Sequence, residues 1–109
     1  MISTEDVCTR AEVISVAGAM LSGKTHLIEG VRQICSLRFE LEDPDDRVFM
    51  PMVAVESETD YFPLGSLRRQ YAAGALQRLD NELDVYLAVE RTDILSACRA
   101  IIHRFTQFG

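Results

Sequence analysis

Residues Arg47 to Gly65 read R-V-F-M-P-M-V-A-V-E-S-E-T-D-Y-F-P-L-G, and they form the one long stretch whose apolar residues lack a helical period. Val48 to Val55 is apolar and partly β-branched, which is typical of a short buried strand. Pro51 lies inside this run and has no backbone donor for a sheet. We therefore predict an extended segment lying on helices, followed by a polar loop from Glu56 to Asp60.

The chain before this stretch has the pattern of two helices. Ser3 and Thr4 can cap the first one, whose apolar stripe consists of Val7, Ala11, Ile14, Gly18 and Leu21. Ser22-Gly23 is a typical helix stop, because glycine adopts the left-handed conformation that a helix end often needs. Thr25 can cap a second helix that runs to Leu37. So short a connection predicts an antiparallel hairpin.

The last third of the chain also has a helical period. Leu76 to Leu87 and Ile94 to Phe105 each carry an apolar stripe, and Thr92-Asp93 between them reads as a capping pair that separates two helices. The sequence therefore predicts a mainly α fold. We expect a single domain over residues 1–109, built as a small four-helix antiparallel bundle with an extended acidic crossover between helices 2 and 3.

Acidic residues are concentrated in that crossover. The net charge of the chain is −6, and residues 40–60 hold eight acids and one base, Arg47. Such a surface repels polyphosphates, so we expect no nucleic-acid partner. Two interpretations stay open. Asp43-Pro44-Asp45-Asp46 has the composition of a solvated turn, and the same acids can form a docking face for a basic partner.

Cysteine and histidine usage gives no sign of a metal site. Cys8, Cys35 and Cys98 are far apart and have apolar neighbours, and His26 and His103 stand alone. This pattern favours reduced thiols in a cytoplasmic protein without a metal or other cofactor. The first residues lack a basic region followed by an apolar run, so we expect no signal peptide. No stretch has the roughly 20 apolar residues of a membrane helix.

Gly18 to Thr25 reads G-A-M-L-S-G-K-T and matches the phosphate-binding motif G-x-x-x-x-G-K-[ST]. A true phosphate loop lies between a strand and a helix of a parallel sheet, for which this chain is too short. Met20 and Leu21 would be exposed in such a loop, yet both fit an apolar helix face. We therefore predict a glycine-terminated helix followed by a capped helix, with no nucleotide bound.

The string Ser57-Glu58-Thr59-Asp60 precedes Tyr61-Phe62-Pro63. Its carboxylates can pair with Arg32, Arg68 or Arg69 and so hold an irregular crossover on the helices. Two carboxylates at this spacing can also serve as an acid and a base. No nucleophile, histidine or metal spacing accompanies them, so we predict a structural role and no enzymatic activity.

This string also carries a resemblance. Together with Ile28-Glu29-Gly30-Val31-Arg32 and the final helices, it resembles a family of small bacterial proteins of unknown function. That family has an I-E-G-x-R helix and an S-E-T-D loop ending near a proline. The likeness spans about residues 21–105. It does not require Gly18, Lys24 or Thr25, and it implies no established activity.

A small, acidic, cytoplasmic domain without a catalytic set has the profile of a protein that binds another protein. Similar profiles are common among bacterial immunity proteins, which occlude a toxin domain that is often basic. We expect carboxylates of the crossover to meet basic groups of such a toxin, with two aromatic side chains as apolar anchors. The alternatives are a nucleotide-binding protein and an accessory subunit of a larger assembly. The predicted partner-binding residues are Asp43, Asp45, Asp46, Glu56, Glu58, Asp60, Tyr61 and Phe62.

Overall fold

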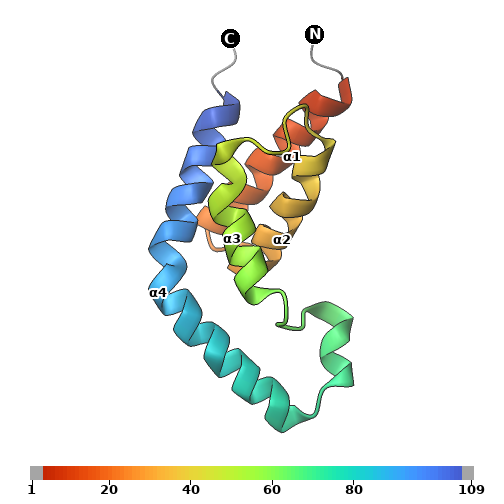
Figure 1. Ribbon diagram of the computed structural model, residues 1–109, viewed down its shortest axis with the longest axis vertical. Helices are drawn as coiled ribbons and strands as arrows, with labels where there is room; N and C mark the ends of the chain where they lie inside the picture. Colours follow the sequence, from red (N-terminus) through yellow and green to blue (C-terminus); the bar gives the residue numbers. More distant parts are fainter. Residues whose placement is uncertain (1–3, 107–109) are drawn as a thin grey trace.

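The computed structural model describes residues 4–106 and is mainly helical, with no strand among these residues (Figure 1). The mainly α fold is confirmed. Its α-helices are α1 (Thr4–Leu21), α2 (Leu27–Leu37), α3 (Met50–Thr59) and α4 (Ala73–Thr106). Three short 3-10 helices lie between them, η1 (Arg38–Glu40), η2 (Arg47–Phe49) and η3 (Gly65–Gln70). The predicted cap at Ser3 lies outside the described residues.

Helices α1 and α2 form the predicted hairpin, with one correction at the cap. Gly23 has a φ of 79°, in the left-handed region, and α1 ends just before it at Leu21. Helix α2 is capped by His26 and not by Thr25, because the imidazole Nδ1 accepts a hydrogen bond of 3.2 Å from the backbone N–H of Ile28. The side chain just before the first helical residue is the one placed to reach a free amide.

The core lies where α1, α2, α3 and the second half of α4 meet. Helix α1 buries Val13, Ala17 and Met20 there, while Val7 and Ala11 of the predicted stripe are exposed. Ile14 and Leu21 of the predicted stripe are half-buried and pack against the core. The buried face of α1 is therefore displaced to one side of the predicted stripe and shares part of it. Met20 packs against Gly30 of α2, where a side chain on the glycine would overlap the Met20 thioether.

The apolar run after Arg47 is helical, and the predicted extended segment is wrong. Pro51 lies in the first turn of α3, where its missing N–H is one of the donors that have no partner in any helix. Asp46 accepts a hydrogen bond from the N–H of Val48 at 3.0 Å and caps η2, which leads directly into α3. Glu56 to Asp60 is therefore the end of a helix rather than a loop.

Helix α4 is one helix of 34 residues, so the predicted break at Thr92-Asp93 is also wrong. Its second half packs on α1 and α3 and buries Ile94, Ala97, Cys98, Ile101 and Phe105. Its first half buries only Leu83 and projects beyond the other helices together with η3 (Figure 1). We call residues 65–87 the arm. Although α4 is long, no described helix has an apolar stretch sufficient to cross a membrane.

Candidate functional site

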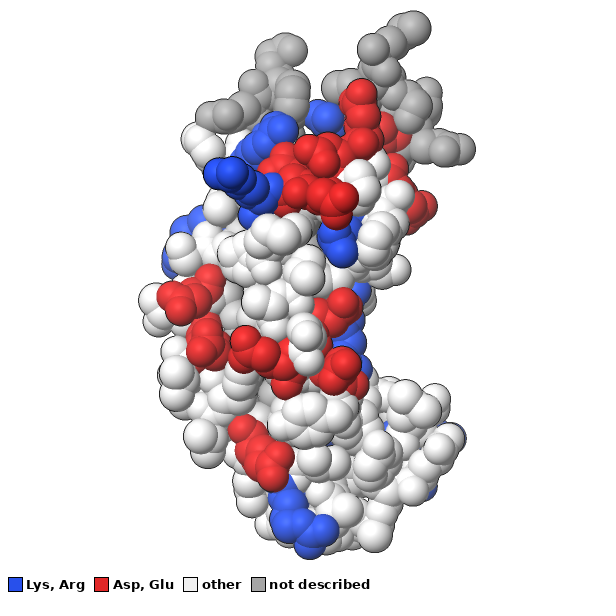
Figure 2. Space-filling view, in the orientation of Figure 1, with Lys and Arg blue, Asp and Glu red and all other residues white. Residues whose placement is uncertain are grey.

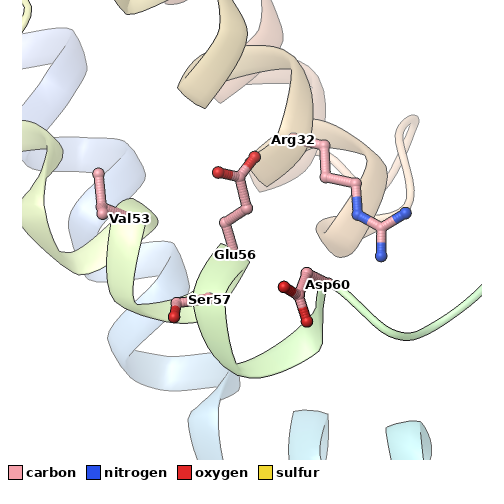
Figure 3. A pocket seen from close by; sticks show the side chains of 5 residues that line it. All are labelled: Arg32, Val53, Glu56, Ser57 and Asp60. Carbon is pink, nitrogen blue, oxygen red and sulfur yellow. The ribbon is translucent and has the colours of Figure 1, made fainter.

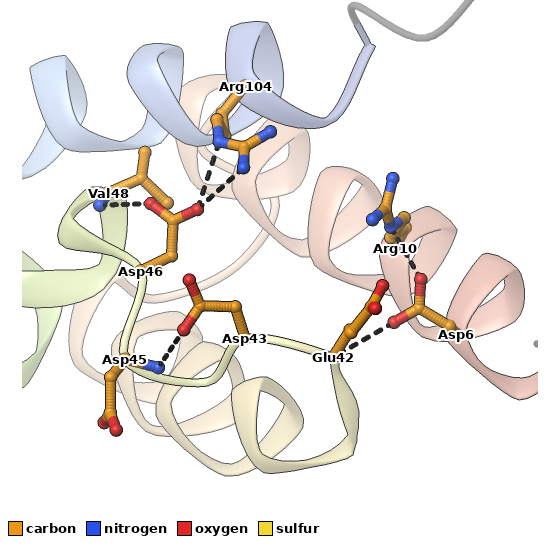
Figure 4. Close-up of polar contacts among 8 residues, drawn as sticks. All are labelled: Asp6, Arg10, Glu42, Asp43, Asp45, Asp46, Val48 and Arg104. Carbon is orange, nitrogen blue, oxygen red and sulfur yellow. Dashed lines mark hydrogen bonds and ion pairs between the residues drawn. The ribbon is translucent and has the colours of Figure 1, made fainter. Parts of the chain in front are cut away.

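The predicted site divides into two groups of acidic side chains with different surroundings (Figure 2). The first group lies in the turn between η1 and η2, and its acids serve the turn itself. Asp43 accepts a hydrogen bond from the N–H of Asp45 at 3.2 Å. Asp45 forms an ion pair with Arg38 at 3.4 Å. Asp46 forms one with Arg104 of α4 at 3.0 Å (Figure 4). The predicted turn is therefore present, and its carboxylates already have partners.

Asp6 joins this turn to the start of α1. Its buried carboxylate accepts a hydrogen bond from the N–H of Glu42 at 3.0 Å and forms an ion pair with Arg10 at 2.8 Å (Figure 4). In the sequence, Asp6 has the signature of an acid in the first turn of a helix, which accounts for its type without a tertiary contact. Nothing local in the sequence indicates that residues 36 positions apart meet here.

The second group begins on the last turns of α3. Glu56 is half-buried, whereas Glu58 and Asp60 are exposed. Glu56 and Asp60 line an open hollow of about 500 Å³ between α2 and α3 (Figure 3). Arg32 lies beside them but donates to the backbone carbonyl oxygens of Thr59 at 2.8 Å and Phe62 at 2.7 Å. The predicted attachment of this segment to the helices thus exists through carbonyl groups, and the carboxylates stay outside it.

Two acids of α4 complete this second group. Glu90 and Asp93 line a smaller hollow of about 170 Å³ between α3 and α4, together with Glu58 and Tyr86. Burial, and then the nearby Glu58 and Glu90 carboxylates, raise the pKa of the Tyr86 hydroxyl to about 12. Sequence reasoning assigned Asp93 to a helix cap and left Glu90 out. Their spacing from Tyr86, four and seven residues, was the available signal, because it predicts one helix face.

We call Glu56, Glu58, Asp60, Glu90 and Asp93 the acidic band. None of the ion pairs found within residues 4–106 involves any of these five carboxylates. Arg32 shares a hollow with Glu56 and Asp60, but its guanidinium donates to backbone carbonyl groups there. A band of this kind attracts cationic groups and keeps its hydration until a partner displaces it.

The two predicted aromatic anchors differ in accessibility. Phe62 is only 3 % exposed and belongs to the core, so it cannot present its ring to a partner. Tyr61 is 54 % exposed and stacks on Phe62 with ring centroids 4.3 Å apart. It borders an apolar hollow of about 570 Å³, which Asn81, Glu82, Val85 and Tyr86 of α4 also line. Of the two rings, only Tyr61 is available as an anchor.

The string Gly18 to Thr25 does not form a phosphate loop. Its first four residues belong to α1, and the backbone N–H groups of Ser22, Lys24 and Thr25 donate to carbonyl groups of Gly18 and Ala19. No strand precedes it in the described chain. The predicted helix end is confirmed, and these amides are not directed outward to cradle phosphates.

Within residues 4–106, no cluster of three or more His, Cys, Asp or Glu side chains is placed to hold a metal ion. The absence of enzymatic activity and of a cofactor stays a prediction. Comparisons of the chain with profiles of protein families, with curated proteins and with solved structures found no match. The likeness to the family with the I-E-G-x-R helix therefore rests on the quoted motifs alone.

Proposed function

We propose that this chain is a non-enzymatic protein-binding module whose acidic band docks a basic protein. The observation that carries the proposal is the contrast between the two acidic groups. Asp45 and Asp46 of the turn are in ion pairs, whereas the five carboxylates of the band lie on two neighbouring helices without a described counter-ion. A purely structural role would not require acidic side chains to cluster around two hollows on one side of the fold.

The chemistry of the band favours a protein partner over a small ligand. Both hollows are open, and their rims combine carboxylates with apolar atoms of Val53, Pro51 and Ala97. Arginine and lysine side chains match such rims, because their aliphatic stems cover apolar surface while their charged ends reach carboxylates. Tyr61, exposed beside the band, supplies the aromatic contact that protein interfaces often use.

The specific form of this proposal is an immunity protein that occludes a basic toxin domain in the bacterial cytoplasm. The band would cover arginines and lysines around the active site of the toxin, and its charge would speed encounter. Electrostatic steering of this kind raises association rates by about 10 to 1,000-fold at low salt. The partner to test first is the product of the gene next to the one that encodes this chain.

The experiment measures association of that product with the wild-type chain and with the variant Glu56→Gln, Glu58→Gln, Asp60→Asn. We expect the variant to associate at least about tenfold more slowly at low salt, with a flatter salt dependence. The matched control is Glu12→Gln, Glu29→Gln, Asp84→Asn, which removes the same charge from exposed positions outside the band. Equal rates for the two triple variants would show that net charge, and not the band, attracts the partner.

A fold measurement accompanies the rates. Circular dichroism and the thermal midpoint of the band variant should stay close to those of the wild type, because its three side chains make no described ion pair. Unfolding of this variant would assign the three acids a structural role and remove the basis of the proposal.

A further inference from the structure

The tip of the arm exposes two large apolar side chains. We call residues 65–79, which comprise η3 and the first turns of α4, the tip. Leu67 is 54 % exposed and Tyr71 is 42 % exposed, and no residue of η3 is buried. Large apolar side chains that share a projecting segment are more typical of an interface than of free surface.

The molecule is less compact than a typical chain of its length, and it exposes more surface to solvent. The radius of gyration is 15.0 Å, while a compact chain of this length has about 13 Å. The accessible surface is 6835 Å², which is about 800 Å² more than the surface expected for a compact monomer of this mass. A standard protein interface buries about 800 Å² on each partner. The excess is thus of the size that one interface would cover.

Charge identifies the kind of partner that fits the tip. Residues 65–79 hold three arginines and no acid. Arg68 is engaged with Asp80 through two hydrogen bonds of 2.9 and 2.7 Å. Arg69 and Arg78 are exposed, and neither is in an ion pair with a described residue. The tip therefore presents two available cations beside Leu67 and Tyr71.

The acidic band of the same chain has the complementary composition. It offers carboxylates without described counter-ions, next to the apolar hollow that Tyr61 and Val85 line. We propose that two copies of this chain pair reciprocally, with the tip of each lying on the acidic band of the other. A two-fold axis satisfies both contacts at once, because each copy contributes one tip and one band. Pairing would cover the band that the proposed basic partner needs, so the two would compete.

The first test is the mass of the wild-type chain in solution. Light scattering at about 100 μM chain and low salt should give twice the mass of 12.2 kDa. The mass should fall toward that of one chain in about 0.5 M salt, because the contacts of the tip are ionic at exposed positions. A monomer under both conditions would overturn the proposal.

The second test exchanges the charges. The tip variant is Arg69→Glu, Arg78→Glu, and the band variant is Glu58→Lys, Asp60→Lys, Asp93→Lys, which makes the net charge of the five band positions positive. Each variant alone should be monomeric, since its tip and band then carry the same sign. An equimolar mixture should form a heterodimer, because the acidic tip meets the basic band and the basic tip meets the acidic band. All five positions are exposed, so the fold should tolerate the changes.

The matched control is Arg47→Glu, Arg99→Glu, which reverses two exposed arginines outside the tip and the band. It should dimerise as the wild type does. If the band variant fails to fold, Glu58→Gln, Asp93→Asn replaces it and should weaken the dimer at least about tenfold. A dimer that persists in the tip variant, or a mixture that stays monomeric, would overturn the proposed pairing. Either result leaves the proposed binding of a basic protein to be decided by its own association rates.

Discussion

Arg32 is the residue whose role departs most from the chemistry expected of it. Its guanidinium reaches the carbonyl groups of Thr59 and Phe62, at and just beyond the end of α3. The last carbonyls of a helix have no partner within it and carry partial negative charge, so a cation is favourable there. Arg32 thereby fixes the end of α3, which is the segment that carries Glu56, Glu58 and Asp60.

We therefore expect Arg32→Met to lower the free energy of unfolding by about 2 kcal/mol, because it removes two hydrogen bonds from a charged donor. Urea unfolding measures this loss. Arg99→Met, at an exposed position of α4, is the control and should change stability by less than about 0.5 kcal/mol. Equal effects of the two substitutions would contradict the role given to Arg32.

The buried thiols make stability depend on pH in the alkaline range. Burial raises the pKa of Cys35 to about 12, with a smaller contribution from Glu56, and it raises the pKa of Cys98 to about 11. The ordinary value is 9.0, so the unfolded chain releases these protons at lower pH than the folded one. The stabilising effect is complete below pH 9 and is lost as the pH rises toward 11 and 12.

Urea midpoints measured from about pH 8 to about pH 11 should therefore fall steadily. The variant Cys35→Ala, Cys98→Ala should be less stable at pH 8, because it leaves cavities, but its midpoints should change less with pH. Tyr86 still titrates in this variant, so a reduced slope is expected and not a flat line. An unchanged slope would show that the thiols do not cause the fall.

At the end of α1, glycine substitutions distinguish a helix terminus from a phosphate-binding loop. Gly18 lies inside α1 with open space where a side chain would begin, so Gly18→Ala should stabilise the chain by about 0.5 to 1 kcal/mol. Gly23 has a φ of 79°, so Gly23→Ala should destabilise it by about 1 kcal/mol or more. Thermal unfolding of both variants gives the two signs. A loss of stability in Gly18→Ala would contradict the helical assignment of this motif.

Thr92 tests the continuity of α4 in the same way. In a continuous helix, Thr92→Ala should stabilise the chain by about 0.5 kcal/mol, because alanine has the higher helix propensity. At a true cap, the same change would cost about 1 kcal/mol. Ser96→Ala, one turn later and also exposed, is the control and should stabilise by a similar amount. The sign of the Thr92 effect in urea unfolding separates one helix from two.

These elements also show which parts of the fold the sequence predicts and why it does not predict the others. The period of apolar residues predicted helices before Leu37 and after Leu76, and glycine predicted the end of α1. Pro51 and Thr92 are compatible with two structures each, a strand edge or a helix start, and a cap or a helix interior. Tertiary packing favours the helical form, in which the neighbouring Met52 and Ile94 are buried in the core. The sequence identified Glu56, Glu58 and Asp60 of the band. It missed the contribution of Glu90 and Asp93, because the packing of α3 on α4 brings these two acids beside Glu58.

At the scale of the whole molecule, the arm and the rest of the fold differ in how many buried side chains hold them in place. The second half of α4 contributes five buried residues, whereas the first half contributes only Leu83, with η3 attached to it by the Arg68–Asp80 pair. Segments with few buried apolar contacts open at low free energy, even when their hydrogen bonds are regular. Besides Leu83, the half-buried Leu79, Tyr86 and Leu87 attach the arm to the core, so its helical structure has less packing than the second half of α4.

Hydrogen exchange measured by mass spectrometry should show this difference in dilute protein at high salt, where pairing is suppressed. Amides of residues 73–82 should exchange about 100-fold or more faster than amides of residues 94–105, because they need only local opening. Asp80→Asn removes the partner of Arg68 and should speed exchange over residues 65–80 further, without changing residues 94–105. Asp84→Asn, at an exposed position of the arm without a described ion pair, should leave both regions as they are. Equal protection along α4 would mean that the arm is as stable as the rest, and its surface would then need no partner to hold it.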